Sequence, residues 1–540
     1  MTKFIRPIAA QPVARARSSS DILPAIRRSL AQTQPMRVAT MLGLMIVCAL
    51  ITNCLAPFYV RGPAAGAPER DFRAALDRQV PRILKQYGVP GMAIGTVLHG
   101  DPGQIYVYGL ADVAKKRPVT PGTVFQVASL SKSVTAWGVL TLVDKGKVDL
   151  DQPVQRYLTR WPLAASPYPA REVTARRLLT HTSGMDAGED TFRAPGDPAP
   201  TTLELLRREG PPQAGKATPA ALTGPAGKAF VYSVPGFTLL QLMIEQQSRQ
   251  PFAAYMRGAV LRPLGMTASD YGWDPKLRDV TATPYLDDGR ASDVLIPEDA
   301  AADGLFSTVR DMVQFVAAPM PGQGLPTGAG VISDRATEQI FLRPSSLPKG
   351  QLQTIGPDAP CLGCFIEHSD GGPVMITNAG DDPGWTAEIH MAPATGDGLV
   401  VLTNSGRGGP AIAQVEAIWA GWRGFPPPQV TRTYQSVGVF AVAVVSLVSV
   451  LAIAAGFGCL TEVAGGARRF AAFSPHACLK SLLEWTLAAS LAWPFLLMRG
   501  VIELLPRFAA ISELILMLLI AAVLARALFP QTGSARMAAA

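Results

Sequence analysis

Long apolar stretches near both ends of the chain dominate its hydrophobic pattern. They lie at about residues 38–58, 436–458, 482–503 and 509–529. Each stretch is close to the roughly 20 apolar residues that a helix needs to cross the hydrocarbon core of a bilayer. The pattern therefore predicts one transmembrane helix before a central block of mixed polarity and three transmembrane helices after it.

The central block, from about 60 to 432, combines strand and helix patterns. Two apolar runs joined by His99-Gly-Asp-Pro-Gly predict an antiparallel strand pair. Apolar residues then recur at helical spacing over 130–145 and 235–248. Strand patterns return late, at 364–368, 374–378, 385–391 and 399–404, before a helix near 410–421. We therefore expect an α+β fold, in which an antiparallel sheet, completed from both ends of the block and flanked by helices, lies beside a helical subdomain.

The positive charge of the chain follows the predicted membrane helices. The 540 residues carry a formal net charge of +8, and many basic residues lie in the N-terminal tail or beside the apolar stretches. Cytoplasmic segments of membrane proteins are enriched in Lys and Arg, so both tails are expected inside the cell. Four crossings then place the central block in the periplasm or at the cell exterior; alternatively, the third and fourth stretches form a re-entrant hairpin. No basic, aromatic-interleaved surface typical of nucleic-acid binding is present in the sequence.

These features predict a multi-pass protein of the inner (plasma) membrane, with the lipid bilayer as a partner. The first apolar stretch is either an uncleaved anchor or a cleaved signal sequence, and both alternatives export the central block. The expected segments are a basic tail at 1–37, the anchor or signal sequence at 38–58, a soluble domain at 70–422, a proline-rich linker at 423–435, three transmembrane helices within 436–529 and a tail at 530–540.

The cysteines and histidines of the central block indicate no metal site. Cys361 and Cys364 are either a redox-active pair, half of a zinc site, or two small buried residues that can form a disulfide in an oxidising compartment. No second Cys/His pair with metal spacing accompanies them. His181 is expected in a structural turn, and His368 and His390 are isolated on strands. We therefore expect neither a metal nor a cofactor.

A serine and a lysine three residues apart carry the candidate chemistry. An apolar, strand-like approach ends at Ser129, where helical periodicity begins. If Ser129 opens a helix, its hydroxyl and the Lys132 amine lie on one face and can meet. A hydroxyl needs a neighbouring base, and a lysine buried at a helix start can lose enough pKa to be that base. Alternatively, Ser129 is an N-cap, a position that serine favours.

Further segments extend this pair into an ordered set. They are Phe125-Gln-Val-Ala-Ser-Leu-Ser-Lys, Leu178-Leu-Thr-His-Thr-Ser-Gly-Met, Tyr232-Ser-Val-Pro-Gly-Phe, Pro263-Leu-Gly-Met, Gly304-Leu-Phe-Ser-Thr-Val-Arg-Asp and Asn378-Ala-Gly-Asp-Asp-Pro-Gly-Trp. Over about 70–422 the chain resembles the serine β-lactamase-like family of class C β-lactamases, D-alanyl-D-alanine peptidases and related esterases. The resemblance implies that Ser129 forms an acyl-enzyme, that Lys132 is its partner and that Tyr232 shuttles protons to the leaving group.

Two side chains depart from the pattern of this family. Val234 stands where the family carries an asparagine, and it offers no amide to Lys132 or to a substrate. Asn378, a candidate substrate-binding residue, stands where the family usually carries a cation that attracts an anionic substrate group, and two aspartates, Asp381 and Asp382, follow it. Coulomb attraction to a substrate carboxylate is therefore absent or repulsive, which disfavours β-lactams and D-Ala-D-Ala termini.

The main-chain part of the expected site is retained. Gly380 permits close backbone approach, and the N–H groups of Ser129 and Asp381 could form the oxyanion hole that the family uses. These residues predict a membrane-anchored serine hydrolase for a neutral or cationic ester or amide, either a small molecule or a peptidoglycan-like substrate. The alternatives are a weak or inert domain that binds cell-wall material or a partner protein, and an adaptor for another membrane protein.

Overall fold

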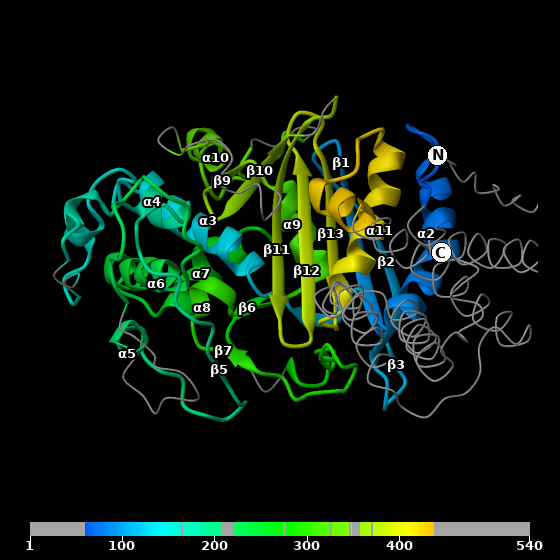
Figure 1. Ribbon diagram of the computed structural model, residues 1–540, viewed down its shortest axis with the longest axis horizontal. Helices are drawn as coiled ribbons and strands as arrows, with labels where there is room; N and C mark the ends of the chain where they lie inside the picture. The colour runs from blue at the N-terminus through cyan, green and yellow to red at the C-terminus, as the bar shows by residue number, and fades with distance from the viewer. Residues whose placement is uncertain are drawn as a thin grey trace, which may run out of the picture. The chain divides into compact units, whose positions relative to one another are not determined.

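The computed structural model describes residues 60–436, apart from 162, 164–165, 208–219, 274–276, 323–326, 345–346, 348–356 and 369–370 (Figure 1). The four predicted membrane helices lie outside these residues, except for the first position of the second helix. The tails at 1–37 and 530–540 also lie outside them. Among the residues described, no helix combines the length and the apolar character needed to cross a membrane.

An eight-stranded antiparallel sheet forms the centre of the described domain, with the strand order β3-β2-β1-β13-β12-β11-β10-β9 (Figure 1). The strands are β1 (Gly91–Leu98), β2 (Asp101–Asp112), β3 (Arg117–Pro118), β9 (Ala359–Cys361), β10 (Cys364–His368), β11 (Val374–Asp382), β12 (Trp385–Ala392) and β13 (Asp397–Thr403). The first strand pairs with the last, and Met92 lies opposite Thr403. The expected α+β fold, with a sheet completed from both ends of the block, is confirmed.

Two long helices cover one face of the sheet, α2 (Glu69–Tyr87) and α11 (Gly408–Arg423). Apolar residues at helical spacing, such as Phe72, Leu76 and Val80, turn the buried side of α2 inward. The ring of Phe72 stacks on Trp422 of α11 at a centroid distance of 4.3 Å. Burial of this face closes a second apolar core behind the sheet. The sequence reading did not predict α2.

The other face carries α3 (Leu130–Asp144), α9 (Val309–Ala317) and the helical subdomain. The remaining helices are α4 (Ala175–Leu179), α5 (Thr202–Arg207), α6 (Val234–Ser248), α7 (Phe252–Met256), α8 (Ala300–Asp303), α10 (Asp334–Ile340) and the short turns η2 (Val154–Tyr157), η3 (Ala170–Glu172) and η4 (Arg257–Leu261). Helices α3 and α6 match the predicted 130–145 and 235–248 closely. Almost every residue of α3 is buried, so it is the central helix of the larger core.

Small strands join the subdomain to the rest of the domain. A three-stranded sheet has the order β4-β8-β6, with β4 (Val124–Gln126), β6 (Asp270–Tyr271) and β8 (Leu305–Thr308), and β5 (Phe192–Arg193) pairs with β7 (Ile296–Pro297). Strand β4 leads directly to α3, and β8 follows α8. The short sheet therefore brings the beginning of α3 and the end of α8 together.

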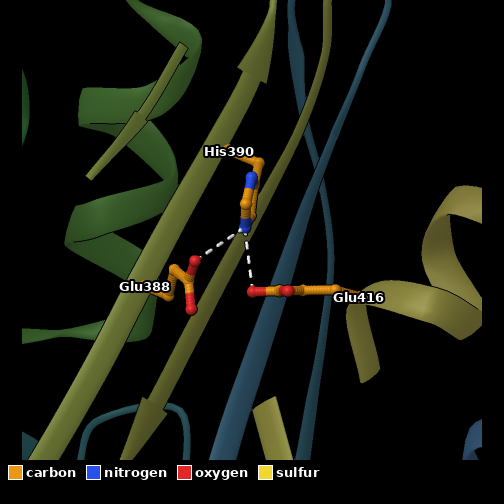
Figure 2. Close-up of side chains that lie close together, drawn as sticks. All are labelled: Glu388, His390 and Glu416. Carbon is orange, nitrogen blue, oxygen red and sulfur yellow. Dashed lines mark hydrogen bonds and ion pairs between the residues drawn. The ribbon is translucent and has the colours of Figure 1, made fainter. Parts of the chain in front are cut away.

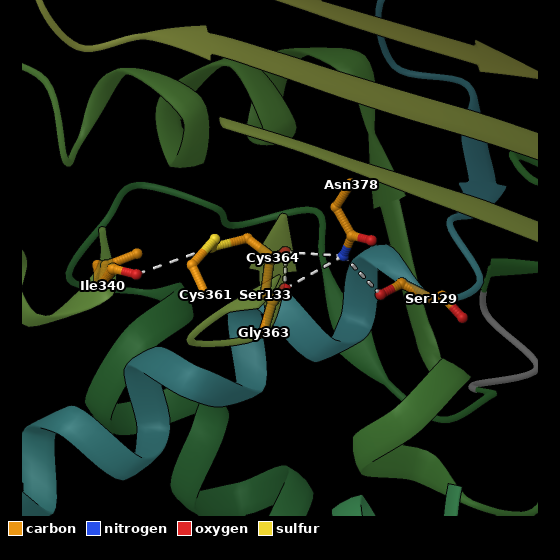
Figure 3. Close-up of a disulfide and its surroundings, with 7 residues drawn as sticks. All are labelled: Ser129, Ser133, Ile340, Cys361, Gly363, Cys364 and Asn378. Atoms are coloured by element: carbon orange, nitrogen blue, oxygen red, sulfur yellow. Dashed lines mark hydrogen bonds between the residues drawn. A yellow bond between two sulfur atoms is a disulfide. The ribbon is translucent and has the colours of Figure 1, made fainter. Parts of the chain in front are cut away.

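Cys361 and Cys364 form a disulfide across the turn between β9 and β10 (Figure 3). Their Cα atoms are 4.8 Å apart, and both side chains are buried. Between them Gly363 has a positive φ of 71°, and a Cβ at this position would meet the Lys132 carbonyl oxygen at 2.5 Å. The disulfide turn therefore packs directly on the first turn of α3. Of the three alternatives for Cys361 and Cys364, the structure agrees with two small buried residues that form a disulfide.

Candidate active site

Ser129 lies at the junction of β4, α3 and β11. The preceding residue, Ala128, has a positive φ of 47°, which is uncommon for a residue other than glycine. On the neighbouring strand, Gly380 leaves no room for a side chain, because a Cβ there would lie 2.4 Å from the Val127 oxygen and 3.0 Å from the Ser129 nitrogen. The structure thus agrees with the prediction that Gly380 permits a close backbone approach to Ser129.

The structure brings Ser129, Lys132 and Tyr232 together. Lys132 Nζ lies 2.9 Å from Ser129 Oγ, and the Tyr232 hydroxyl donates to the same oxygen at 2.8 Å. Ser129 occupies the N-cap position of α3, but its side chain makes no capping hydrogen bond. The hydroxyl therefore faces the site and does not serve the helix end.

A fourth side chain, Asp303, completes this cluster, and sequence reasoning did not find it. Ser129 Oγ donates to Asp303 Oδ1 at 2.7 Å, and Lys132 Nζ lies 3.1 Å from the same oxygen. The side chains of Lys132 and Asp303 are 2% and 5% exposed, so the pair is removed from solvent. The only sequence signal is that Asp303 directly precedes the Gly304-Leu-Phe-Ser segment.

Asp303 changes the expected state of Lys132. Burial by itself disfavours the ammonium, but the charge of Asp303, with a contribution from Tyr232, outweighs it and holds the pKa of Lys132 above its usual range. The Ala302 carbonyl accepts a further hydrogen bond from Nζ at 3.2 Å. The expectation that desolvation lowers the pKa of this lysine is therefore wrong, because the buried amine has a buried carboxylate partner.

Tyr232 is held by His181 and by the start of α6. The two rings stack at a centroid distance of 4.3 Å, and His181 Nδ1 accepts a hydrogen bond from the Ser233 N–H at 3.0 Å. Burial, reinforced by the charge of Lys132, lowers the pKa of His181 well below its usual value, so the imidazole is neutral. Val234, the first residue of α6, is buried in the apolar core.

Asn378 links three parts of the site through its amide nitrogen (Figure 3). It donates to the Ser129 carbonyl at 3.1 Å, to Ser133 Oγ at 2.9 Å and to the Gly363 carbonyl at 3.3 Å. Ser133 Oγ in turn donates to the Gly363 carbonyl at 2.6 Å. This geometry commits the Asn378 nitrogen to protein acceptors, whereas the sequence suggested a group that meets substrate.

An acidic cavity opens beside the end of β11. It has a volume of about 510 Å³ and is lined by Leu286, Asp287, Asp288, Asp381, Asp382, Pro383 and Gly384. Partial desolvation and the charge of Asp287 raise the pKa of Asp381 to about 6. Burial, with the like charge of Asp303, holds the pKa of Asp382 well above its usual range, although Gln126 donates to Asp382 at 2.7 Å. The lining residues are acidic or uncharged, and Arg290 pairs with one of them, Asp288.

A separate buried cluster lies between β12 and α11, on the face of the sheet opposite α3 (Figure 2). His390 Nε2 lies 2.8 Å from a Glu416 oxygen and 3.2 Å from a Glu388 oxygen, so the expectation that His390 is isolated is wrong. Burial opposes the imidazolium, but Glu416 and Glu388 hold the pKa of His390 well above its usual range. These residue types could ligate a metal, and a proton shared among them also balances their charges.

Comparisons with known proteins match this geometry. A protein-family model described as "Beta-lactamase" matches residues 76–420. A Bacillus subtilis penicillin-binding protein is 29% identical over 312 residues, which are 52% of this chain and 64% of that protein, less than two thirds of its length. Esterase EstB of Burkholderia gladioli is 28% identical over 324 residues, 57% of this chain and 80% of that protein.

Solved structures share the fold. The octameric penicillin-binding protein homologue from Pyrococcus abyssi superposes with a TM-score of 0.54 at 24% identity, over 66% of this chain and 78% of that chain. At this identity the likeness concerns the fold alone.

Proposed function

Because this chain belongs to the beta-lactamase family of serine hydrolases, we propose that its central domain hydrolyses an ester or amide through an acyl-enzyme on Ser129. The observation that carries the proposal is the cluster in which the half-buried Ser129 Oγ meets both Lys132 Nζ at 2.9 Å and the Tyr232 hydroxyl at 2.8 Å. Such a cluster can move the hydroxyl proton away and supply one to a leaving group.

The proposed reaction begins with attack of Ser129 Oγ on the substrate carbonyl carbon. The N–H groups of Ser129 and Asp381 are the proposed donors to the developing oxyanion, where preorganised donors are commonly worth a few kcal/mol. Tyr232 or Lys132 then protonates the leaving group, and water releases the acyl group by the reverse sequence. None of these steps needs the Asn378 or Val234 side chain.

The charge of the site favours a neutral or cationic substrate, either a small molecule or a peptidoglycan-like ester or amide. The cavity beside β11 carries four aspartates. A substrate carboxylate placed there would meet the carboxylates of Asp287 and, above about pH 6, of Asp381, whereas an ammonium group would be attracted.

Labelling of Ser129 tests the proposed activity. A fluorophosphonate probe should modify the detergent-solubilised full chain, and Ser129→Ala should abolish the modification as seen by peptide mass spectrometry. Hydrolysis of a neutral ester, a D-amino-acid amide and a chromogenic cephalosporin should then rank the cephalosporin last. Absence of labelling by several probe classes on folded protein would contradict the hydrolase, and fast cephalosporin turnover would contradict the substrate class.

The hydrolase domain is further proposed to be held at the outer face of the plasma membrane by the apolar segments at 38–58, 436–458, 482–503 and 509–529. Their length and the flanking basic residues support this placement. The disulfide supports an oxidising compartment. Protein that is extracted from membranes by alkaline carbonate, or a central domain that resists added protease in intact spheroplasts, would contradict it.

A non-catalytic domain is the second candidate, and two observations favour it. Val234 lies in the core, and the Asn378 nitrogen is bound to protein groups. The domain would then bind cell-wall material or a partner protein, or act as an adaptor for another membrane protein. Unchanged cellular behaviour of a Ser129→Ala strain, together with a partner that co-purifies, would support this candidate.

A further inference from the structure

We propose that Asp303 is a catalytic residue that accepts the Ser129 proton directly during acylation, while Lys132 remains a cation. This role rests on the proposed hydrolase function and adds a group that the sequence motifs do not contain. It assigns the base to α8, an element remote in sequence from both Ser129 and Tyr232.

The direction of the hydrogen bonds carries the proposal. A serine hydroxyl has one proton and must aim it at an acceptor. Two of the neighbours of Ser129 Oγ, the Lys132 ammonium and the Tyr232 hydroxyl, donate to it at 2.9 Å and 2.8 Å. Asp303 Oδ1, at 2.7 Å, is the acceptor. An ammonium cannot take a further proton, so the Ser129 proton already points at the carboxylate.

The position of Asp303 is set by hydrogen bonds that flank it on both sides. Thr135 of α3 donates to the Ala301 carbonyl at 2.8 Å, and the Ala301 N–H donates to Gln241 of α6 at 3.0 Å. On the other side, the Leu305 N–H donates to Ser131 Oγ at 2.9 Å. A carboxylate on a short helix tied to two core helices is preorganised for a fixed proton transfer.

Asp303 also supplies Lys132 with a polar partner, which Val234 cannot supply. Val234 has no polar group for Lys132, and its side chain is 4% exposed in the core. The carboxylate oxygens of Asp303 lie 3.1 Å and 3.4 Å from Lys132 Nζ. A carboxylate there differs from an amide because it can accept a proton as well as hold the amine.

The proton transfers balance. The Ser129 O–H bond breaks as its proton moves to Asp303 Oδ1, and the Oγ electron pair forms the bond to the substrate carbonyl carbon. When the tetrahedral adduct collapses, the leaving group departs with its bonding electrons and takes a proton that comes from Lys132, either directly or through Tyr232, which Lys132 then reprotonates. Asp303 then returns its proton to Lys132, 3.1 Å away, which restores the starting charges.

Four titratable groups face or influence Asp303 and set the pH dependence. Lys132 comes from α3, and Tyr232 precedes α6. Burial and the charge of Asp303 hold the pKa of Asp382, at the end of β11, above its usual range, and neutral His181 lies behind Tyr232. Removing the Asp303 charge therefore acts first on Lys132, whose ammonium it stabilises.

The test is the rate of fluorophosphonate acylation of the full chain in detergent, between about pH 5 and pH 10. Fluoride leaves without needing a proton, so this rate reports the base alone. Asp303→Asn should slow labelling at pH 7 by about 100-fold or more. Its rate should rise with pH, because Lys132 without a carboxylate partner loses its proton more easily and replaces the missing base. Asp303→Glu should recover part of the rate.

A matched control is Asp311→Asn, which alters another buried carboxylate that binds Ser269 and does not contact Ser129. It should keep the wild-type rate and pH profile. Wild-type rate and profile in Asp303→Asn would overturn the role of Asp303 and leave the hydrolase intact, whereas an unlabelled wild type would contradict the hydrolase itself. If Asp303→Asn does not fold, Asp303→Ser decides, because it also lacks a carboxylate, and an unshifted pH profile at the wild-type rate in this variant would overturn the role.

Discussion

At the scale of single residues, the site depends on a buried ion pair. Lys132 and Asp303 are almost completely removed from water, and each is the main counter-charge of the other. Removing one partner of a buried pair leaves an uncompensated charge, which commonly costs about 3–5 kcal/mol. Their pairing therefore serves folding as well as chemistry.

Lys132→Met should lower the free energy of unfolding by about 3–5 kcal/mol, because Asp303 then stays buried without a cation. The double variant Lys132→Met/Asp303→Asn should recover much of that loss, since both charges are gone. Urea denaturation of the solubilised chain measures the cycle. Strictly additive losses would argue that the two side chains do not interact. Neither variant should label at the wild-type rate.

The raised pKa of Lys132 also sets a pH window. Because the folded state holds the ammonium more tightly than the unfolded chain, its contribution to stability is complete below the unfolded pKa of about 10.4 and is lost as the pH rises above that value. The pair therefore contributes fully at neutral pH.

Asp381 predicts a pH-dependent preference for cationic substrates. Its pKa of about 6 means that the carboxyl is neutral below that pH and charged above it. The KM of an ammonium-bearing ester should therefore fall as the pH rises through about 6, while the KM of a neutral ester of the same shape stays constant. Asp381→Asn should flatten the difference and keep its backbone N–H. Equal pH dependence for the two esters would contradict this reading.

At the scale of elements, the contact between β11 and the start of α3 decides the geometry of the site. Gly380 allows the strand backbone to touch Val127 and Ser129. Asn378, two residues before Gly380 on the same strand, donates hydrogen bonds to Ser133 of α3 and to Gly363 of the disulfide turn. Strand β11 therefore lines the site and also holds the backbone of Ser129 in position.

Gly380→Ala should reduce acylation of Ser129 by about 100-fold or more, because the added Cβ would lie 2.4 Å from the Val127 oxygen and must push β11 away from α3. Gly258→Ala is the matched control, since a Cβ there meets nothing within 4 Å. Fluorophosphonate labelling rates compare the two. Normal labelling of Gly380→Ala would show that the close approach is dispensable.

At the scale of the whole domain, a second polar cluster fastens its C-terminal end. Glu416 accepts from Thr431 at 2.7 Å and from His390, and the backbone N–H of Gln429 donates to Glu367 at 2.5 Å. The segment around 429–436 is thereby attached to the sheet face opposite Ser129. This segment leads toward the predicted transmembrane helices.

Glu416→Gln should destabilise the domain by about 3–5 kcal/mol, because the buried His390 loses its closest carboxylate. The labelling rate of Ser129 at moderate temperature should not change, since the cluster lies across the sheet from it. Urea denaturation and labelling of the same preparation separate the two effects. Loss of labelling in a fully folded variant would link the cluster to the site.

Much of the fold could be predicted from local pattern. Alternating and helical periodicities lie close to the bounds of β1, β10, β12, α3 and α6, because each element buries a face whose spacing is visible in the sequence. Helix α2 was not predicted although Phe72, Leu76 and Val80 recur at helical spacing, and Pro81 inside it is a residue that helix interiors disfavour. Ser129, Lys132 and Tyr232 could also be predicted, because they belong to short motifs that are visible in the sequence.

The sequence by itself determined the α+β class, the central sheet and the segments from which the nucleophile and its neighbours come. Only the tertiary structure decided the protonation and the direction of hydrogen bonds at the site. Asp303 is 174 residues from Ser129, and its carboxylate reverses the expected effect of burial on Lys132. The same holds for His390, whose partner Glu416 belongs to another element. Charges act through space, and their neighbours exist only once distant elements have packed.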